Sequence, residues 1–367
     1  MFAGKHVIDV HGHMSTPPHF RAHAYNLIAL RTADSGLAIT EEQMKGPLDR
    51  HLRMLDSHRI DHQVLSPRPV AMMHWEAPFL VDAWAVATNN IIAQQCRLHP
   101  TRFAGIAQLN QSAERDTSFC VAELERCIGE LGFVGAIVNP DPGADRTTPG
   151  MNDKYWFPLY AKAEELDATL VVHPSISRDR RLDIIPHSYQ YNNLTEETLA
   201  TLLLEHSDVF ARFPKLRIVI CHCGGSLRRM PERGEPMDAV LHEHGHPNIV
   251  GDSGETAGGS GVSAGIVSRH GSADLSNNLF FDTCVYDPHF LGAAIKQRGV
   301  KRMVFGTEVP GSGSDMLNPL TGKAADDVLA IIEGFDFLTD ADRLAIVHEN
   351  PLRVFPLLAR KLAAAKI

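Results

Sequence analysis

The sequence lacks the marks of a nucleic-acid-binding, membrane-spanning or secreted protein. Its 367 residues carry 35 Lys and Arg against 44 Asp and Glu, a net charge of −9, so no broad basic face is expected. No apolar run approaches the roughly 18 residues that a membrane span needs. Residues 1–9 lack the basic-then-apolar pattern of a signal peptide. We therefore expect a cytoplasmic protein with neither nucleic-acid nor membrane partners.

Cysteine is also scarce, with six residues in the whole chain. That number in a chain of this length does not form the dense disulfide framework of a small secreted domain. Cys221 and Cys223 flank His222, but no second cysteine pair follows at zinc-ribbon spacing. We expect reduced thiols and no structural zinc site at this position.

No Gly-x-Gly-x-x-Gly follows any apolar run, which weighs against a dinucleotide-binding sheet. What is present is an alternation of short apolar runs with longer stretches of helical character. The expected strands are Val7–His13, Gln63–Pro69, Phe103–Leu109, Val134–Pro140, Thr169–Pro174, Leu216–Gly224, Leu279–Tyr286 and Met303–Pro310. The expected helices include Asp49–Ile60, Val81–Leu98, Phe119–Leu131 and Thr195–Phe213, the last capped by its first residue. Eight such units predict an α/β fold, a single (β/α)₈ barrel domain over residues 1–367, with an open doubly wound sheet as the alternative.

Reactive side chains close several of the expected strands. His11 and His13 end the first strand, His173 the fifth, His222 the sixth and Glu308 the eighth. His11 and His13 share one face because strand side chains alternate. In this fold the strand ends meet at one mouth, where the active site lies. Three imidazoles and a carboxylate suit zinc or manganese, so we predict that His11, His13, His173 and Glu308 hold one divalent metal, zinc first.

Other polar residues near these strand ends have several interpretations. His222 could be a further ligand, a packed structural residue or a general acid/base, and we favour the last because imidazole titrates near neutral pH. Arg68 is framed by two prolines and suits bidentate binding of a carboxylate, with a surface salt bridge as the alternative. Of Arg228, Arg229 and Arg233, at least one is expected to meet an anionic substrate or a neighbouring subunit.

Two connections look irregular. The segment Thr16–Lys45 is long and carries several His and Arg residues, and Gly251–Gly271 is rich in glycine and serine. Either could close over a substrate. For the second, a tolerated surface insertion is an equal alternative.

Four segments carry a resemblance to a known family. They are Asp9-Val-His-Gly-His13, Leu65-Ser-Pro-Arg-Pro69, Asn139-Pro-Asp-Pro142 with Tyr155-Trp-Phe-Pro-Leu-Tyr160, and Phe305-Gly-Thr-Glu-Val-Pro-Gly-Ser-Gly-Ser314. Over essentially the whole chain, these residues resemble the amidohydrolase superfamily, in the branch that includes aminocarboxymuconate-semialdehyde decarboxylase. Within that branch the chain is most similar to the 4-oxalomesaconate hydratase family. Decarboxylases and hydrolases of the branch usually carry Asp where this chain has Glu308, which favours the hydratase family. The segment after His222, in contrast, differs from the pattern of that family.

The resemblance implies a metal-dependent lyase of small unsaturated oxo-di- or tricarboxylates from aromatic catabolism, most simply a hydratase. It implies that His222 and Glu308 are catalytic, that Arg68, Asn139 and Arg233 bind substrate, and that the protein is a homodimer or higher oligomer. We expect hydration because Glu reaches about one methylene further than Asp, so its carboxylate can sit over a metal-bound water. Decarboxylation, metal-dependent hydrolysis and a non-catalytic metabolite sensor remain alternatives.

Overall fold

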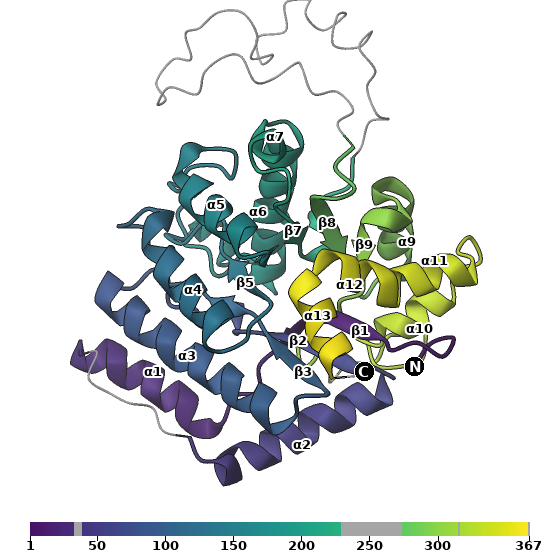
Figure 1. The fold of residues 1–367 in the computed structure, drawn as a ribbon, viewed down its shortest axis with the longest axis horizontal. Coiled ribbons are helices and arrows are strands. Elements are labelled where there is room, and N and C mark those ends of the chain that lie inside the picture. The colour runs from purple at the N-terminus through teal and green to yellow at the C-terminus, as the bar shows by residue number, and fades with distance from the viewer. Residues whose placement is uncertain (33–38, 229–273, 315, 366–367) are drawn as a thin grey trace, which may run out of the picture.

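The computed structural model describes residues 1–32, 39–228, 274–314 and 316–365 (Figure 1). Within them, short strands alternate with helices that pack around the outside. The strands are β1 (Ile8–His13), β2 (His62–Ser66), β3 (Phe103–Gly105), β4 (Ala107–Gln108), β5 (Gly135–Val138), β6 (Thr169–Val172), β7 (Ile218–Ile220), β8 (Leu279–Asp282) and β9 (Met303–Val304). Every ladder between them is parallel, as strand–helix alternation predicts.

The strands follow one another in space in sequence order, in two sheets, β1-β2-β3 and β4 to β9. Strands β3 and β4 are two pieces of one expected strand, separated by Ile106. Backbone bonds continue on either side of this interruption, from Ile106 N to Leu65 O and from Val134 N to Gly105 O, each 2.9 Å. The eight expected strand segments are therefore all present.

The other seam lies between β9 and β1. Val10 N donates to Phe305 O at 2.9 Å, and Glu308 N donates to His11 O at 2.6 Å. Hydrogen bonds thus join the first and last strand segments, although regular ladder pairing is absent there among the described residues. The prediction of a (β/α)₈-type fold is confirmed over the open doubly wound sheet.

Both faces of the strands are buried. One face contributes to an inner cluster that includes Val10, Val171 and Val304, all at most 3% exposed. The other face packs against the helices in a second, larger cluster. Helices α12 (Asn350–Val354) and α13 (Pro356–Ala364) join the inner cluster at the start of the strands, where Thr169 Oγ1 donates to Val354 O at 2.6 Å. The inner cluster is closed by packing at that end, and in this fold the active site lies at the opposite end of the strands.

The remaining helices surround the strands. They are α1 (Pro18–Leu30), α2 (Glu41–Ser57), α3 (Pro78–Leu98), α4 (Val121–Gly129), α5 (Phe157–Glu165), α6 (Ser188–Glu205), α7 (Val209–Arg212), α9 (Pro288–Arg298), α10 (Val328–Glu333) and α11 (Asp340–Leu344). Three of the four expected helices are found among them with different boundaries, and the fourth, Thr195–Phe213, is divided between α6 and α7. No helix in the described residues is long and apolar enough to cross a membrane.

Two expectations about these elements are wrong. The segment Thr16–Lys45 is not one irregular loop, because it contains α1 and the start of α2. Helix α1 places few apolar residues inward, chiefly Phe20 and Leu27, so its periodicity is weak. Thr195 does not cap a helix, because α6 already begins at Ser188 and the Thr195 hydroxyl donates within the helix to Tyr191 O. Gly251–Gly271 lies outside the described residues.

Candidate active site

The four predicted metal ligands converge at the carboxyl ends of the strands. His11 and His13 belong to β1, His173 follows β6, and Glu308 follows β9. One ligand atom from each lies within 4.8 Å of the others, so the four could hold one ion. The ring centroids of His11 and His13 are 5.2 Å apart, and those of His11 and His173 are 5.1 Å apart. The fold thus brings together residues almost 300 positions apart in the sequence.

Each imidazole is fixed through its Nδ1 atom. His11 Nδ1 lies 2.7 Å from Asp282 Oδ2, and His173 Nδ1 lies 2.7 Å from the carbonyl oxygen of the next residue. His13 Nδ1 lies 2.7 Å from Ser66 Oγ, whose own proton is donated to a backbone carbonyl. With Nδ1 donating in all three rings, Nε2 carries the free lone pair. Such outer partners orient metal-binding histidines in general.

The free atoms test whether a metal fits. The Nε2 atoms of His11 and His173 are buried and have no hydrogen-bond partner. A buried polar atom without a partner costs about 1–3 kcal/mol, a cost that a bound cation would remove. His13 Nε2 lies 3.5 Å from Glu308 Oε1. Three imidazole nitrogens and a carboxylate oxygen form a donor set typical of zinc or manganese, so the site fits a single divalent metal.

The electrostatics of the cluster keep its members in the ligating form. Burial lowers the pKa of His13 to about 4 and the pKa of His173 well below its usual range, so both rings are neutral at pH 7. Burial alone would raise the pKa of Glu308. The adjacent His13 ring and the positive charge of His222 outweigh burial and hold that pKa well below its usual range. Glu308 is therefore a carboxylate.

Glu308 also has a fixed orientation. Its backbone φ is 67°, a left-handed conformation that is uncommon for a residue with a side chain and typical of functional positions. The Tyr286 hydroxyl donates to Glu308 Oε2 at 3.0 Å. One carboxylate oxygen thus faces His13 and the other is held by Tyr286.

His222 stands beside the four-residue cluster. Its ring centroid lies 5.0 Å from that of His173 and 5.4 Å from that of His11. Its Nδ1 lies 2.6 Å from Glu197 Oε1 on α6. Burial lowers the pKa of His222, but the Glu197 carboxylate outweighs burial and raises this pKa to about 10. His222 could also form a ligand group with His11 and Cys284, within the same 4.8 Å limit.

A cavity of about 190 Å³ opens onto the cluster. Its lining includes His13, His173, Glu308, Arg68, Tyr189 and Asn193. Arg68 enters it from the end of β2, between Pro67 and Pro69. In the part of the chain that the structure describes, the Arg68 guanidinium has neither a hydrogen bond nor an ion pair. A half-buried cation without a partner suits an anionic ligand.

The other two predicted substrate contacts, Asn139 and Arg233, have different outcomes. Asn139 is 1% exposed, its Oδ1 accepts from Asp141 N at 3.1 Å, and its Nδ2 lies 3.3 Å from His74 Nδ1. It is not among the lining residues. Arg233, like Arg229, lies outside the described residues. Arg228 is exposed and pairs with Glu205 at 3.0 Å.

The sequence reasoning missed Glu197, Tyr286, Tyr189 and Asn193. Glu197 lies on α6, is fully buried, and contacts His222 at the strand ends. The spacing of residues 189, 193 and 197 is the signal that could have found three of them. Residues four apart lie on one face of a helix.

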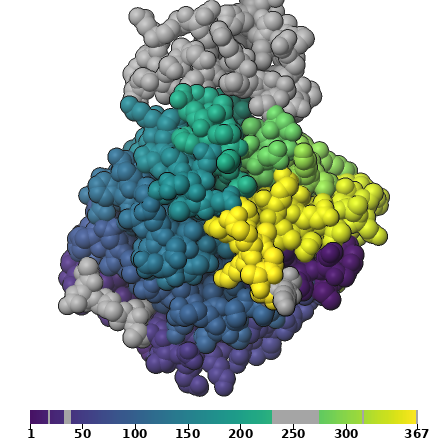
Figure 2. All heavy atoms as spheres, in the orientation of Figure 1, coloured from purple at the N-terminus to yellow at the C-terminus, as the bar shows by residue number. Residues whose placement is uncertain are grey.

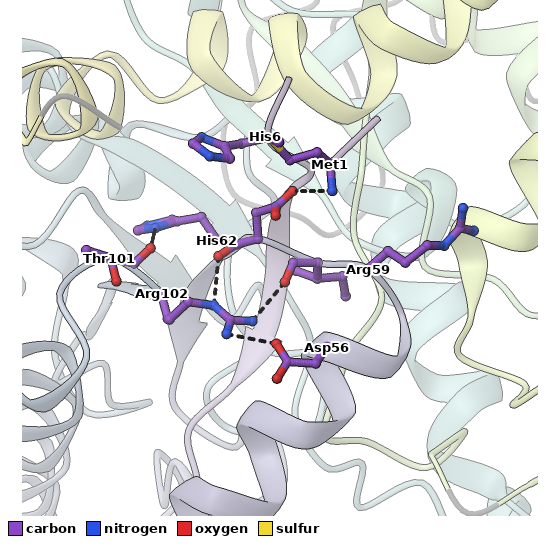
Figure 3. A pocket seen from close by; sticks show the side chains of 9 residues that line it. Met1, His6, Asp56, Arg59, His62, Thr101 and Arg102 are labelled. Atoms are coloured by element: carbon purple, nitrogen blue, oxygen red, sulfur yellow. Dashed lines mark hydrogen bonds and ion pairs between the residues drawn. The ribbon is translucent and has the colours of Figure 1, made fainter. Parts of the chain in front are cut away.

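A larger cavity of about 640 Å³ lies at the other end of the strands (Figure 3). Its cations are paired with carboxylates: Arg102 with Asp56 at 2.9 Å, and the Met1 amino group with Asp61 at 2.9 Å. Arg59 pairs with Glu333 at 2.7 Å. The Nε2 atom of His62 is buried there without a partner, but no group of potential metal ligands forms around it in the described chain. This cavity is therefore not the candidate site.

Comparison with known proteins agrees with the geometry. The amidohydrolase family matches residues 8–357, and the chain belongs to this family. It is 32% identical, over 98% of both chains, to 2-keto-4-carboxy-3-hexenedioate hydratase from Sphingobium sp. (strain NBRC 103272 / SYK-6). It also resembles the crystal structure of 4-oxalomesaconate hydratase from Rhodopseudomonas palustris, with a TM-score of 0.76 and 27% identity over 98% of both chains.

A more distant structure shares the fold. A dihydroxybenzoic acid decarboxylase from Polaromonas sp. JS666, solved with bound manganese and an inhibitor, has a TM-score of 0.63 and 20% identity, covering 98% of this chain and 99% of its own. Hydratases and decarboxylases are both lyases, and the chain is a lyase of the amidohydrolase family. The resemblance inferred from the sequence is confirmed.

Proposed function

We propose that the protein is a metal-dependent hydratase that adds water across a C=C bond of a small unsaturated oxo-di- or tricarboxylate. The observation that carries this proposal is the unpaired Arg68 in one small cavity with His13, His173 and Glu308. The cavity has room for a small molecule, and its unpaired cation selects for a carboxylate. The names of the hydratase relatives give substrates of this class.

His11, His13, His173 and Glu308 would hold the metal. Zinc is our first choice because it is common with imidazole and carboxylate donors, and manganese is the second because the Polaromonas decarboxylase binds it. When bound, the metal supplies Lewis-acid polarisation of an oxygen.

The chain's own residues supply the remaining steps. Arg68 binds a substrate carboxylate and orients the double bond. Glu308 accepts a proton from the attacking water, with its second oxygen held by Tyr286. His222 delivers a proton to the other carbon, so hydroxyl and hydrogen add across the double bond and no group is lost. The hydrogen bond between Tyr286 and Glu308 favours this chemistry, because hydration requires a base for water.

Non-oxidative decarboxylation is the second candidate, since a decarboxylase shares the fold. That reaction needs the proton from His222 but no attack by water. Turnover of 4-oxalomesaconate in H₂¹⁸O separates the two. Hydration places ¹⁸O on the new alcohol carbon and keeps every carbon, whereas CO₂ release with no ¹⁸O incorporation would replace this proposal with a decarboxylase.

The proposal includes a cytoplasmic location and a homodimer or higher homo-oligomer. Light scattering on the purified protein measures the second directly. A monomer at micromolar concentration would contradict it and leave the active-site chemistry unchanged.

A further inference from the structure

Helix α6 forms a wall of the site that the metal chemistry does not require. Tyr189, Asn193 and Glu197 follow one another at intervals of four residues, which places them on one face of the helix. Tyr189 and Asn193 line the cavity, and Glu197 contacts His222. Thr195 and Leu199, on another face, are exposed. The face toward the strands is therefore polar where a structural helix would present apolar residues.

Glu197 is the most unusual residue on this face. It is 0% exposed, and its Oε2 atom is buried without a hydrogen-bond partner. Burying a carboxylate costs free energy unless it is well paired. The neighbouring Glu196 shows the ordinary solution, a 2.7 Å ion pair with Arg146. Among the described residues, Glu197 has one hydrogen-bond partner, His222. Because burying this carboxylate costs free energy that stability alone does not justify, we expect Glu197 to act on the His222 imidazole.

The loop that carries His222 is fixed against α6 beyond Glu197. Ser226 N donates to Thr198 Oγ1 at 2.7 Å, and Thr201 Oγ1 donates to Gly224 O at 3.0 Å. Gly225 has a φ of 76°, and a Cβ atom there would lie 2.5 Å from Thr198 N. The helix and the loop therefore touch backbone to backbone, and the relative position of Glu197 and His222 is set by rigid contacts.

We propose that Glu197 is the positioning residue of His222. The carboxylate accepts the Nδ1–H of the ring, fixes its rotation, and leaves Nε2 to deliver a proton to substrate. A carboxylate on the far nitrogen orients catalytic histidines in this way in unrelated enzymes. The inference rests on the proposed function of His222 as proton donor.

The test is a double-mutant cycle between Glu197 and His222. Glu197→Ala should lower kcat by about 10²-fold, within the range of general acid–base catalysis, with KM nearly unchanged and about one metal per chain retained. Glu197→Gln keeps an acceptor oxygen and should recover part of that loss. In a His222→Asn background, Glu197→Ala should cause no further loss, because both changes disable one unit. Glu196→Gln, one residue away, is the matched control and should leave kcat unchanged.

Two outcomes would overturn the positioning role. One is an equal loss from Glu197→Ala in both backgrounds, and the other is loss of the metal in Glu197→Ala. Failure of the proposed hydration would appear separately, in the wild-type ¹⁸O result. If the wild type decarboxylates instead, the same cycle on that reaction still tests Glu197, because the proton also comes from His222.

One turn earlier, Asn193 carries a second, independent observation. Asn193 lines the cavity, is 7% exposed, and has an Oδ1 atom that is buried without a partner. An amide can offer an acceptor and two donors to a ligand. We infer that Asn193 contacts the oxygen atoms of the substrate and helps to determine its specificity.

Two variants separate contact from packing. Asn193→Ala should raise KM about tenfold, the value of one hydrogen bond, with kcat little changed. Asn193→Asp has nearly the same shape but adds a negative charge facing an anionic substrate, so its KM should rise further. Thr195→Ala, on the exposed face of α6, is the control. An unchanged KM in both Asn193 variants would show that the residue only packs.

Discussion

The two ends of the strands contain two cavities that differ in the state of their charges. The cavity at the start of the strands is the larger, about 640 Å³ against about 190 Å³. Its cations, such as Arg102, pair with carboxylates of the same chain (Figure 3). The cavity at the strand ends contains Arg68, which has no such partner in the described residues, and adjoins two buried imidazole nitrogens without hydrogen bonds.

This difference shows that an unpaired cation beside a group of potential metal ligands identifies a site better than the volume of a cavity does. Salt bridges within the larger cavity lower its energy without any ligand. In the smaller cavity, the imidazole nitrogens gain a partner only when a metal cation binds, and Arg68 gains one only when an anionic ligand binds. On the face toward the viewer in Figure 2, the C-terminal segment that contains α12 and α13, in yellow, covers part of the molecule. The predictions below test this contrast.

The largest effect is expected from His11→Ala. This change removes one ligand, so the purified variant should contain well under one equivalent of metal after zinc or manganese supplementation. Loss of the several kcal/mol that a metal contributes to the transition state corresponds to a fall in kcat/KM of at least about 10³-fold. Metal analysis and steady-state kinetics measure both effects. A fully loaded and active variant would show that the four residues are not the metal centre.

The next effect is expected from His222→Asn. The variant should retain its metal but lose turnover by roughly 10²–10⁴-fold, the usual contribution of a general acid. Metal content distinguishes the possibilities, because a metal-free variant would make His222 a ligand. An unchanged rate would show that its contacts with Glu197 and His173 are only structural.

A smaller effect is expected from Arg68. Arg68→Lys keeps the charge but loses the planar pair of donors, so KM should rise about tenfold, and Arg68→Met should raise it further. The order wild type, Lys, Met in KM is the diagnostic result. Full activity in both variants would show that Arg68 does not bind substrate, as is expected of the paired arginines at the opposite end.

The smallest effect is expected at the larger cavity. Arg59→Ala breaks the pair with Glu333, in which both side chains are partly exposed. Such surface pairs contribute about 0–1 kcal/mol, so thermal unfolding should change slightly and kcat/KM should not change. A marked loss of activity with an intact fold would break the contrast, because it would assign a function to the cavity with paired charges.

The strand ends could be predicted from the sequence because local patterns and fold geometry agree there. His11, His13, His173 and Glu308 each follow an apolar run, and parallel strands bring such ends together. Helix α6 could not be placed in the same way. It begins after His187, whose φ is 55°, without a side-chain hydrogen bond that the sequence would reveal. A polar stripe on a helix is normally a solvated face, so the inward orientation of Glu197 depends on tertiary contacts.

The close contact between Gly225 and α6 has a consequence for protein engineering. In a scan of all substitutions, we expect Gly225 to tolerate no other residue. The loss of activity should be larger than the loss of stability accounts for. Gly225 contributes no side chain to the reaction, yet any larger residue must displace the helix that carries Asn193 and Glu197. Attempts to evolve the pocket toward bulkier substrates should therefore keep Gly225 constant and vary the exposed side of α6 or the residues around Ser312.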